Sequence, residues 1–207
     1  MSFYFIKSSI VNKSLLQYFD KKSSTFQRDE ALQTASFYLA FELSKFLPNE
    51  TGEVQSYNVP ITLPIVSSCI TLLPILRAGL PMVTAFRKCL NADKVVHIVT
   101  ERDSIEQIRV LNVLGLSYIK NHIYIILDAI VGKGVTINTV IENLRLLGIE
   151  EKSIYVATIM AASQGVKSIS NRYKDVSIFS CYVEPHLDSE ADKMPRCGDV
   201  GYHLFGV

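Results

Sequence analysis

An acidic residue, a glycine-containing loop and a helical pattern follow one another in the middle of the chain. Residues 123–127 are apolar, Asp128 comes next, and residues 132–136 read Gly-Lys-Gly-Val-Thr. A helix that starts here offers N–H groups without helical partners and a partial positive charge, to which Lys133 adds a full charge. This combination suits a phosphate monoester, and Asp128 could accept hydrogen bonds from sugar hydroxyls or hold a water molecule of a magnesium ion. The alternative is an ordinary strand-to-helix turn in which Thr136 caps the helix.

Two arginines follow other apolar segments. Arg77 comes directly after a long uncharged stretch and precedes Ala78 and Gly79, whereas Arg102 follows the mostly apolar residues 94–100. The planar guanidinium group matches phosphate oxygens, so Arg77 could hold a diphosphate. Taken alone, Arg77 could equally be a surface arginine at a turn.

The C-terminal segment also has a pattern that could bind a ligand. Within residues 195–207, two close glycines, Gly198 and Gly201, indicate a tight loop that Leu204 and Phe205 would anchor. Exposed backbone N–H and C=O groups in such a loop can recognise the amide edge of a flat heterocycle. A structured tail without a ligand is the alternative.

One edge of a sheet would bring these groups together. We expect helices at residues 25–47, 80–90, 136–147 and 164–172, and strands at residues 67–76, 94–100, 123–127, 154–161 and 176–182. This alternation predicts a mostly parallel sheet with helices on both faces. Ligands bind at the carboxyl ends of such strands, here just after Leu76, Thr100, Leu127 and Tyr182.

Three segments depart from this alternation. Residues 49–57 are polar and are expected to form turns, and residues 102–116 have the alternating apolar positions of a β-hairpin or flap. Residues 55–76 carry no charge, but they contain three prolines, which fit a membrane-spanning helix poorly. We therefore expect a buried strand there.

Length and composition exclude several classes of protein. A chain of 207 residues predicts a single domain, residues 1–207, and 48% hydrophobic residues exclude a long disordered protein. The formal charge of +1 gives no sign of a nucleic-acid or membrane-surface binder. None of the four cysteines forms a CxxC pair, which argues against structural zinc, and no basic, apolar signal peptide begins the sequence. A cytoplasmic location with reduced thiols is expected.

The residues discussed so far resemble the uracil phosphoribosyltransferase family along nearly the whole chain. The similarity is carried by residues 74–80, which read Pro-Ile-Leu-Arg-Ala-Gly-Leu, with Met82; by Arg102 and Asp103; by the segment from Asp128 to Thr136; by residues 164–166; by residues 198–201 with Phe205 and Gly206; and by Arg28 and Glu42 near the N-terminus. The resemblance implies the type I phosphoribosyltransferase fold, an α/β fold. In it, a mostly parallel twisted sheet is flanked by helices and carries a β-hairpin flap and a C-terminal hood.

The same resemblance implies a reaction in pyrimidine salvage. The phosphoribosyl group of phosphoribosyl pyrophosphate (PRPP) would pass to uracil, giving uridine monophosphate (UMP) and pyrophosphate. Mg²⁺ would arrive with PRPP, without direct protein ligands. The implied catalytic residues are Arg77, Arg102 and Asp128. The implied PRPP-binding residues are these three with Ala78, Gly79, Gly132, Lys133, Gly134, Val135 and Thr136, and the implied uracil-binding residues are Lys193, Met194, Gly198, Asp199, Val200, Gly201 and Tyr202.

Seven positions differ from the usual pattern of the family, and three of them lie in the flap, where Asn112, Val113 and Gly115 stand in place of a pair of tyrosines and a lysine. Lys133 stands where the family has Thr, Val135 where it has a second Gly, and Tyr202 and His203 where it has Asp and Arg. A β-branched residue at position 135 would be strained if the loop needs a positive φ there. Two further interpretations therefore stay open: a homologue that binds PRPP or a nucleotide without catalysis, and a phosphoribosyltransferase for a different base.

We also expect a homodimer. Residues 59–65 and 102–116 carry more apolar surface than a small domain obviously covers. Dimers with two-fold symmetry are the commonest assemblies of soluble proteins.

Overall fold

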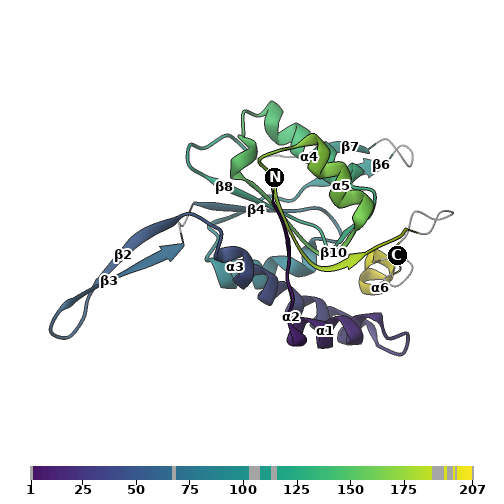
Figure 1. The fold of residues 1–207 in the computed structure, drawn as a ribbon, viewed down its shortest axis with the longest axis horizontal. Coiled ribbons are helices and arrows are strands. Elements are labelled where there is room, and N and C mark those ends of the chain that lie inside the picture. Colours follow the sequence, from purple (N-terminus) through teal and green to yellow (C-terminus); the bar gives the residue numbers. More distant parts are fainter. Residues whose placement is uncertain are drawn as a thin grey trace.

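A parallel sheet forms the centre of the molecule (Figure 1). The computed structural model describes residues 2–66, 69–102, 108–112, 116–187, 194, 198 and 200–206, with only the backbone described at residues 102, 108, 109, 111 and 112. The sheet contains β1 (Ser2–Phe5), β4 (Ile70–Pro74), β5 (Lys94–Val95), β8 (Ile123–Leu127), β9 (Ile130–Val131), β10 (Ile154–Ala162) and β11 (Ser177–Glu184). Their order is β1-β11-β10-β8-β4-β5, β9 lies beside β10, and these pairs run parallel. The expected mostly parallel sheet is confirmed.

The central strands are mostly apolar because helices cover both of their faces. Every residue of β4 and of β8 is buried, as parallel sheets require. Alternate residues point to opposite faces, so Ile125 and Leu127 belong to one apolar cluster and Tyr124 and Ile126 to the other.

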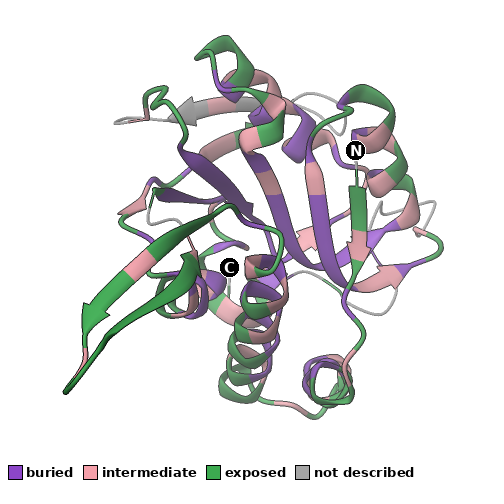
Figure 2. Ribbon diagram, turned by 60° about the vertical axis from the view of Figure 1, so that its left-hand side comes forward, coloured by how far each residue is buried: buried purple, intermediate pink, exposed green. Residues whose placement is uncertain are grey.

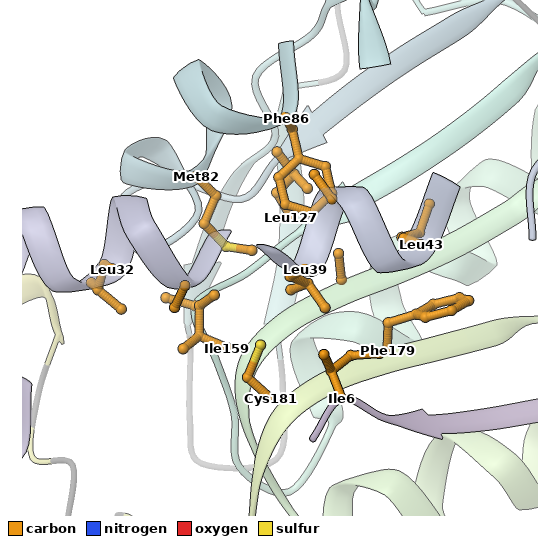
Figure 3. Packing of buried hydrophobic residues seen from close by; sticks show 14 of the residues in the cluster. Ile6, Leu32, Leu39, Leu43, Met82, Phe86, Leu127, Ile159, Phe179 and Cys181 are labelled. Carbon is orange, nitrogen blue, oxygen red and sulfur yellow. The ribbon is translucent and has the colours of Figure 1, made fainter. Parts of the chain in front are cut away.

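Helices from the two halves of the chain cover different faces (Figure 1). One face packs against α1 (Ser9–Phe19), α2 (Thr25–Ser44) and α3 (Val83–Leu90), the last preceded by the short 3₁₀ helix η1 (Leu80–Met82); the other packs against α4 (Val135–Leu146) and α5 (Ser163–Arg172). A second short 3₁₀ helix, η2 (Glu151–Ser153), and α6 (Val200–Phe205) complete the described helices. In Figure 3, Met82 and Phe86 converge with Leu39 of α2 and Ile159 of β10 on the first face. The helices expected at residues 80–90, 136–147 and 164–172 are confirmed.

The N-terminal residues form elements that the sequence analysis did not predict. Strand β1 extends the sheet beside β11, and α1 precedes α2. Arg28 joins these two helices, because its guanidinium donates to the carbonyl oxygens of Tyr18 at 3.2 Å and Asp20 at 2.9 Å. Helix α2 begins with a reciprocal capping box between Ser24 and Gln27. Among the described residues, no helix is both long and apolar enough to cross a membrane.

A protruding hairpin corrects two of the expectations. Residues 49–57 were expected to form turns, but most of them belong to β2 (Asn49–Gln55), which pairs antiparallel with β3 (Pro60–Val66). Strand β3 is exposed over most of its length, so the expected buried strand within residues 55–76 is confined to β4. Residues 49–66, the two strands and their connection, are called the arm from here on and extend away from the body of the protein (Figure 2). Antiparallel pairing gives the polar strand hydrogen-bond partners, and the prolines of β3 are tolerated because the hairpin is a two-stranded edge.

A second hairpin lies on the side of the molecule opposite the arm (Figure 1). Strand β6 (Val99–Arg102) pairs antiparallel with β7 (Ile108–Asn112), which confirms the expected hairpin. Residues 103–107 and 113–115 lie outside the described residues. The strand expected at residues 94–100 is divided, because β5 runs beside β4 whereas Val99 already belongs to this hairpin.

Candidate active site

The loops that carry Arg77 and Asp128 lie side by side at the carboxyl edge of the sheet. Strands β4 and β8 are neighbours, and Pro74 is in register with Leu127. Beyond the last paired residues, the Ile75 amide still donates to the Leu127 carbonyl oxygen at 2.9 Å. The structure therefore brings together the acidic residue and the first arginine, which are far apart in the sequence.

The loop after β4 turns tightly around Arg77. The Leu76–Arg77 peptide bond is cis, and the Gly79 amide donates to the Ile75 carbonyl oxygen at 2.8 Å. Gly79 itself is buried, whereas Arg77 is exposed and Ala78 is half-buried. The loop therefore leaves Arg77 exposed while Gly79 packs inward.

Asp128 is a buried carboxyl group. Its side chain is 7% exposed, and the amide of Ile130 donates to its Oδ1 at 3.4 Å. Burial raises the pKa of Asp128 from its ordinary 3.8 to about 7, although the Ile130 amide opposes the shift. Near neutral pH, Asp128 can therefore exchange a proton and can serve hydroxyl groups as either acceptor or donor.

The loop after Asp128 leads into α4 through a left-handed glycine. Gly134 is the N-cap with φ +81°, and the first helical bond runs from the Asn138 amide to the Gly134 carbonyl oxygen at 2.9 Å. The alternative of Thr136 as N-cap is wrong, because Gly134 takes this position and the helix starts one residue earlier than expected. The positive φ also falls on Gly134 and not on Val135, so the branched side chain of Val135 is not strained.

This start of α4 has the features of an anion site. The amides of residues 135–137 precede the first helical hydrogen bond, so they are the helix's unsatisfied N–H groups. The positive end of the helix dipole lies at the same place, and Lys133 and Gly132 are half-buried in the loop before it. The predicted residues 132–136 thus form one local structure whose chemistry suits a phosphate.

Gly165 is part of this site, although the sequence analysis carried it only in the family resemblance and assigned it no role. It lies in the first turn of α5, where a Cβ would be 2.1 Å from the carbonyl oxygen of Gly132. A signal was available, because Gly165 closely follows the strand predicted at residues 154–161. The sequence analysis placed ligand binding at the carboxyl ends of four other strands and did not include the end of this one.

Helix α6, in the C-terminal segment, packs against α2, and the His203 ring meets the Tyr18 ring of α1 edge-on. Met194 and Val200 are 3% exposed and belong to the apolar cluster, whereas Tyr202 on α6 is 64% exposed. Gly198 has φ +65°, and the His203 side chain occupies the space where its Cβ would be. Of the predicted uracil-binding residues, Gly201 is half-buried on α6, and Lys193 and Asp199 lie outside the described residues. The side chain of Arg102, a predicted catalytic residue, also lies outside them.

A second buried carboxyl group lies at the same edge and was not predicted. Glu184, the last residue of β11, is 4% exposed, and the Tyr182 hydroxyl donates to its Oε2 at 3.4 Å. The sequence analysis ended this strand at Tyr182, before the acidic residue. Among the described residues, no three His, Cys, Asp or Glu side chains gather into a group that could hold a metal ion.

Comparisons with known proteins identify the family of the chain. The family model for uracil phosphoribosyltransferase matches residues 6–207. Uracil phosphoribosyltransferases of Burkholderia thailandensis and Burkholderia mallei are each 26% identical over 206 residues, which cover 99% of this chain and 94% of the relative.

Solved structures show the same fold. The AQ2163 protein from Aquifex aeolicus superposes with a TM-score of 0.89 at 22% identity, covering 99% of this chain and 98% of the other. The adenine phosphoribosyltransferase of Trypanosoma brucei, solved with AMP, pyrophosphate and ribose-5-phosphate, gives a TM-score of 0.59 at 15% identity, covering 95% and 88%. The type I phosphoribosyltransferase fold is confirmed. Since the family model spans nearly the entire sequence, the chain belongs to the uracil phosphoribosyltransferase family, a family of transferase enzymes.

Proposed function

We propose that this protein transfers the phosphoribosyl group of PRPP to uracil, giving UMP and pyrophosphate. The observation that carries the proposal is the meeting, at one edge of the sheet, of the Arg77 loop with the connection from β8 to α4. The Arg77 loop contacts the end of β8, Asp128 follows that end directly, and Gly134 opens the helix beyond it. PRPP has three parts that need recognition: a diphosphate, a ribose and a 5′-phosphate.

The 5′-phosphate fits the start of α4. The N–H groups of residues 135–137 and the helix dipole would hold its oxygens, and Lys133 would add charge. This phosphate does not react, so it serves as a handle that fixes the sugar relative to the other groups.

The diphosphate is assigned to Arg77 and Arg102. Negative charge grows on the leaving diphosphate as its bond to the sugar breaks, and guanidinium groups stabilise that charge. Mg²⁺ bound to the PRPP oxygens would supply further positive charge there. The donor set fits a metal that PRPP carries, because Asp128 is the buried carboxylate beside the Arg77 loop and could reach such an ion through a water molecule.

Asp128 is assigned to the ribose. When it is ionised, its oxygens accept hydrogen bonds from the sugar hydroxyls, and its negative charge favours the cationic character that the sugar gains in the transition state. Uracil is assigned to the tail, residues 193–202, whose backbone groups would read the amide edge of the base. The buried side chains of Met194 and Val200 would anchor this segment.

A direct assay tests the proposal. Purified protein incubated with uracil, PRPP and Mg²⁺ should release UMP and pyrophosphate, and the reaction should stop when Mg²⁺ is chelated. Adenine, hypoxanthine and orotate in place of uracil test the interpretation that the base is different. No nucleotide product with any base, over a wide range of protein concentration, would refute the transferase activity.

The departures from the family pattern support a second candidate function, binding of PRPP or a nucleotide without catalysis. Tyr202 and His203 stand where the family has Asp and Arg, and the Tyr202 side chain is mostly exposed on α6. Calorimetry that shows UMP or PRPP binding, together with no product in the assay above, would favour this candidate.

We also propose that the protein is a homodimer that uses the arm. Its exposed apolar side chains belong to Val54, Val59, Ile61, Leu63 and Ile65. Apolar side chains gathered on a protruding hairpin mark an interaction surface. The cytoplasmic location stays a prediction.

A further inference from the structure

Helix α5 touches the proposed phosphate loop without belonging to it. Gly165 lies in its first turn, and a Cβ there would be 2.1 Å from the carbonyl oxygen of Gly132. The contact is reciprocal, since a Cβ on Gly134 would be 3.0 Å from the Gly165 carbonyl oxygen. Two backbones therefore pack directly on each other at this point, with no side chain between them.

A hydrogen bond joins the same two helices one turn further along. The Nδ2 atom of Asn138 in α4 donates to the Ser168 hydroxyl in α5 at 2.9 Å. Asn138 is 8% exposed, and its buried Oδ1 atom has no hydrogen-bond partner in the described part of the chain. Asn138 is also the residue whose amide makes the first helical bond to Gly134. The start of α4 is thereby tied to α5 through both its backbone and its side chain.

The end of α5 is anchored in the apolar cluster and to α4. Ile169 and the following Tyr173 are fully buried in the apolar cluster, and the Tyr173 hydroxyl donates to the Asn138 carbonyl oxygen at 2.9 Å. Gly132 and Lys133 in the loop are only half-buried. A group inserted between Gly165 and Gly132 would push the two backbones apart and so displace the loop relative to α5.

We infer that Gly165 and Ser168 are positioning residues for the 5′-phosphate. They would not touch the ligand, but they would determine where the amides of residues 135–137 lie. This inference rests on the proposed function and deepens it, because it assigns the geometry of the phosphate subsite to a helix outside it. A misplacement of about 1 Å in a binding group can cost on the order of 100-fold in rate.

Two substitutions test the inference. Gly165→Ala introduces the Cβ that must push the loop aside, since Cβ contacts below 3.0 Å essentially never occur. Ser168→Ala removes the hydroxyl that accepts the hydrogen bond from Asn138 Nδ2 and displaces the backbone much less. This variant therefore remains informative if Gly165→Ala does not fold. One matched control is Gly52→Ala in the arm, where the three atoms nearest to a Cβ all belong to the Ile65 side chain. The other is Ser170→Ala, which removes a hydroxyl that donates to the Val166 carbonyl oxygen within α5.

Binding of UMP is compared with binding of uridine, which lacks the phosphate, by calorimetry at equal salt. The wild-type protein and both controls should prefer UMP. Gly165→Ala should lose at least about tenfold in UMP affinity, and Ser168→Ala several-fold, while uridine affinity stays unchanged. In turnover, KM for PRPP should rise more than kcat falls.

The outcomes separate the inference from the proposed function. A wild-type protein that prefers UMP, with the same preference in both variants, overturns the inference alone. Equal loss of UMP and uridine affinity also overturns it, because general loosening of the site would explain that result. A wild-type protein that binds neither compound refutes the proposed function, and the inference with it.

Discussion

Gly79 packs directly on the carbonyl oxygen of Leu127, so closely that a Cβ at position 79 would lie 2.1 Å from that oxygen. Leu127 is the residue before Asp128, and Gly79 is two residues after Arg77. This contact therefore sets the spacing between the proposed diphosphate-binding arginine and the proposed ribose-binding carboxylate. A glycine is needed at position 79 because any larger residue would separate the two loops.

Arg77→Ala should reduce the rate of UMP formation by at least about tenfold. A charge-assisted hydrogen bond to the leaving diphosphate contributes roughly 1.5–3 kcal/mol, and more if it strengthens as charge develops. Folding should be unaffected because Arg77 is exposed. The control is Arg87→Ala, which removes an exposed arginine from the last turn of α3. Steady-state kinetics decide the matter, and full activity in Arg77→Ala would make Arg77 an ordinary surface residue.

Asp128→Asn should stabilise the protein at pH 8 and have little effect at pH 4. Burial raises the pKa of Asp128 to about 7 in the folded protein, so the folded state favours the protonated acid. Stability is therefore lost as the pH rises from about 4 to 7, and an amide escapes this loss. The difference in pKa corresponds to at most roughly 4 kcal/mol. Urea unfolding of both proteins between pH 4 and pH 8 measures it, and a gain that does not change with pH contradicts the prediction.

Lys133→Ala should weaken PRPP and UMP binding alike, by about tenfold at low salt. The 5′-phosphate carries the same charge before and after the reaction, so the loss should appear in KM and in the UMP dissociation constant and not in kcat. Salt should reduce the difference if the site is open to solvent. Lys88→Ala, at an exposed position in the last turn of α3, serves as the control. Equal UMP affinities in wild type and Lys133→Ala would remove Lys133 from the site.

Leu63→Glu should convert a dimer into a monomer. Leu63 is 60% exposed on the arm, and a carboxylate in an apolar interface would be desolvated without a partner. The dimer dissociation constant should rise by about 100-fold or more. Light scattering at micromolar concentration measures the mass, with Glu53→Gln on the paired strand as the control. A monomeric wild-type protein would show that the arm does not hold two copies together.

The predicted strands and helices were confirmed where one short segment contains all the residues that indicate the element and its ends. The strand at residues 123–127 was predicted with its observed ends, because a short apolar run followed by an acidic residue and glycines marks both its core and its limit. The helix that starts near Gly134 was predicted within one residue. Its N-cap was missed because a left-handed glycine and a threonine hydroxyl are both acceptable helix starts in sequence.

The arm was not predicted because the sequence of neither strand, taken alone, indicates a protruding hairpin. Strand β2 is polar throughout most of its length, and β3 is an uncharged run that resembles a core strand. Only their pairing with each other, outside the central sheet, makes both of them strands.

By itself, the sequence determined most of the central strands and helices, their mostly parallel sheet and the placement of Arg77 and Asp128 just after strands, since periodicity and turn residues are local properties of the chain. The tertiary structure alone decided the contact of Gly165 with Gly132, the buried Glu184 and the raised pKa of Asp128. These features arise where segments distant in sequence exclude water or meet backbone to backbone, and no local pattern of residue types records such a meeting.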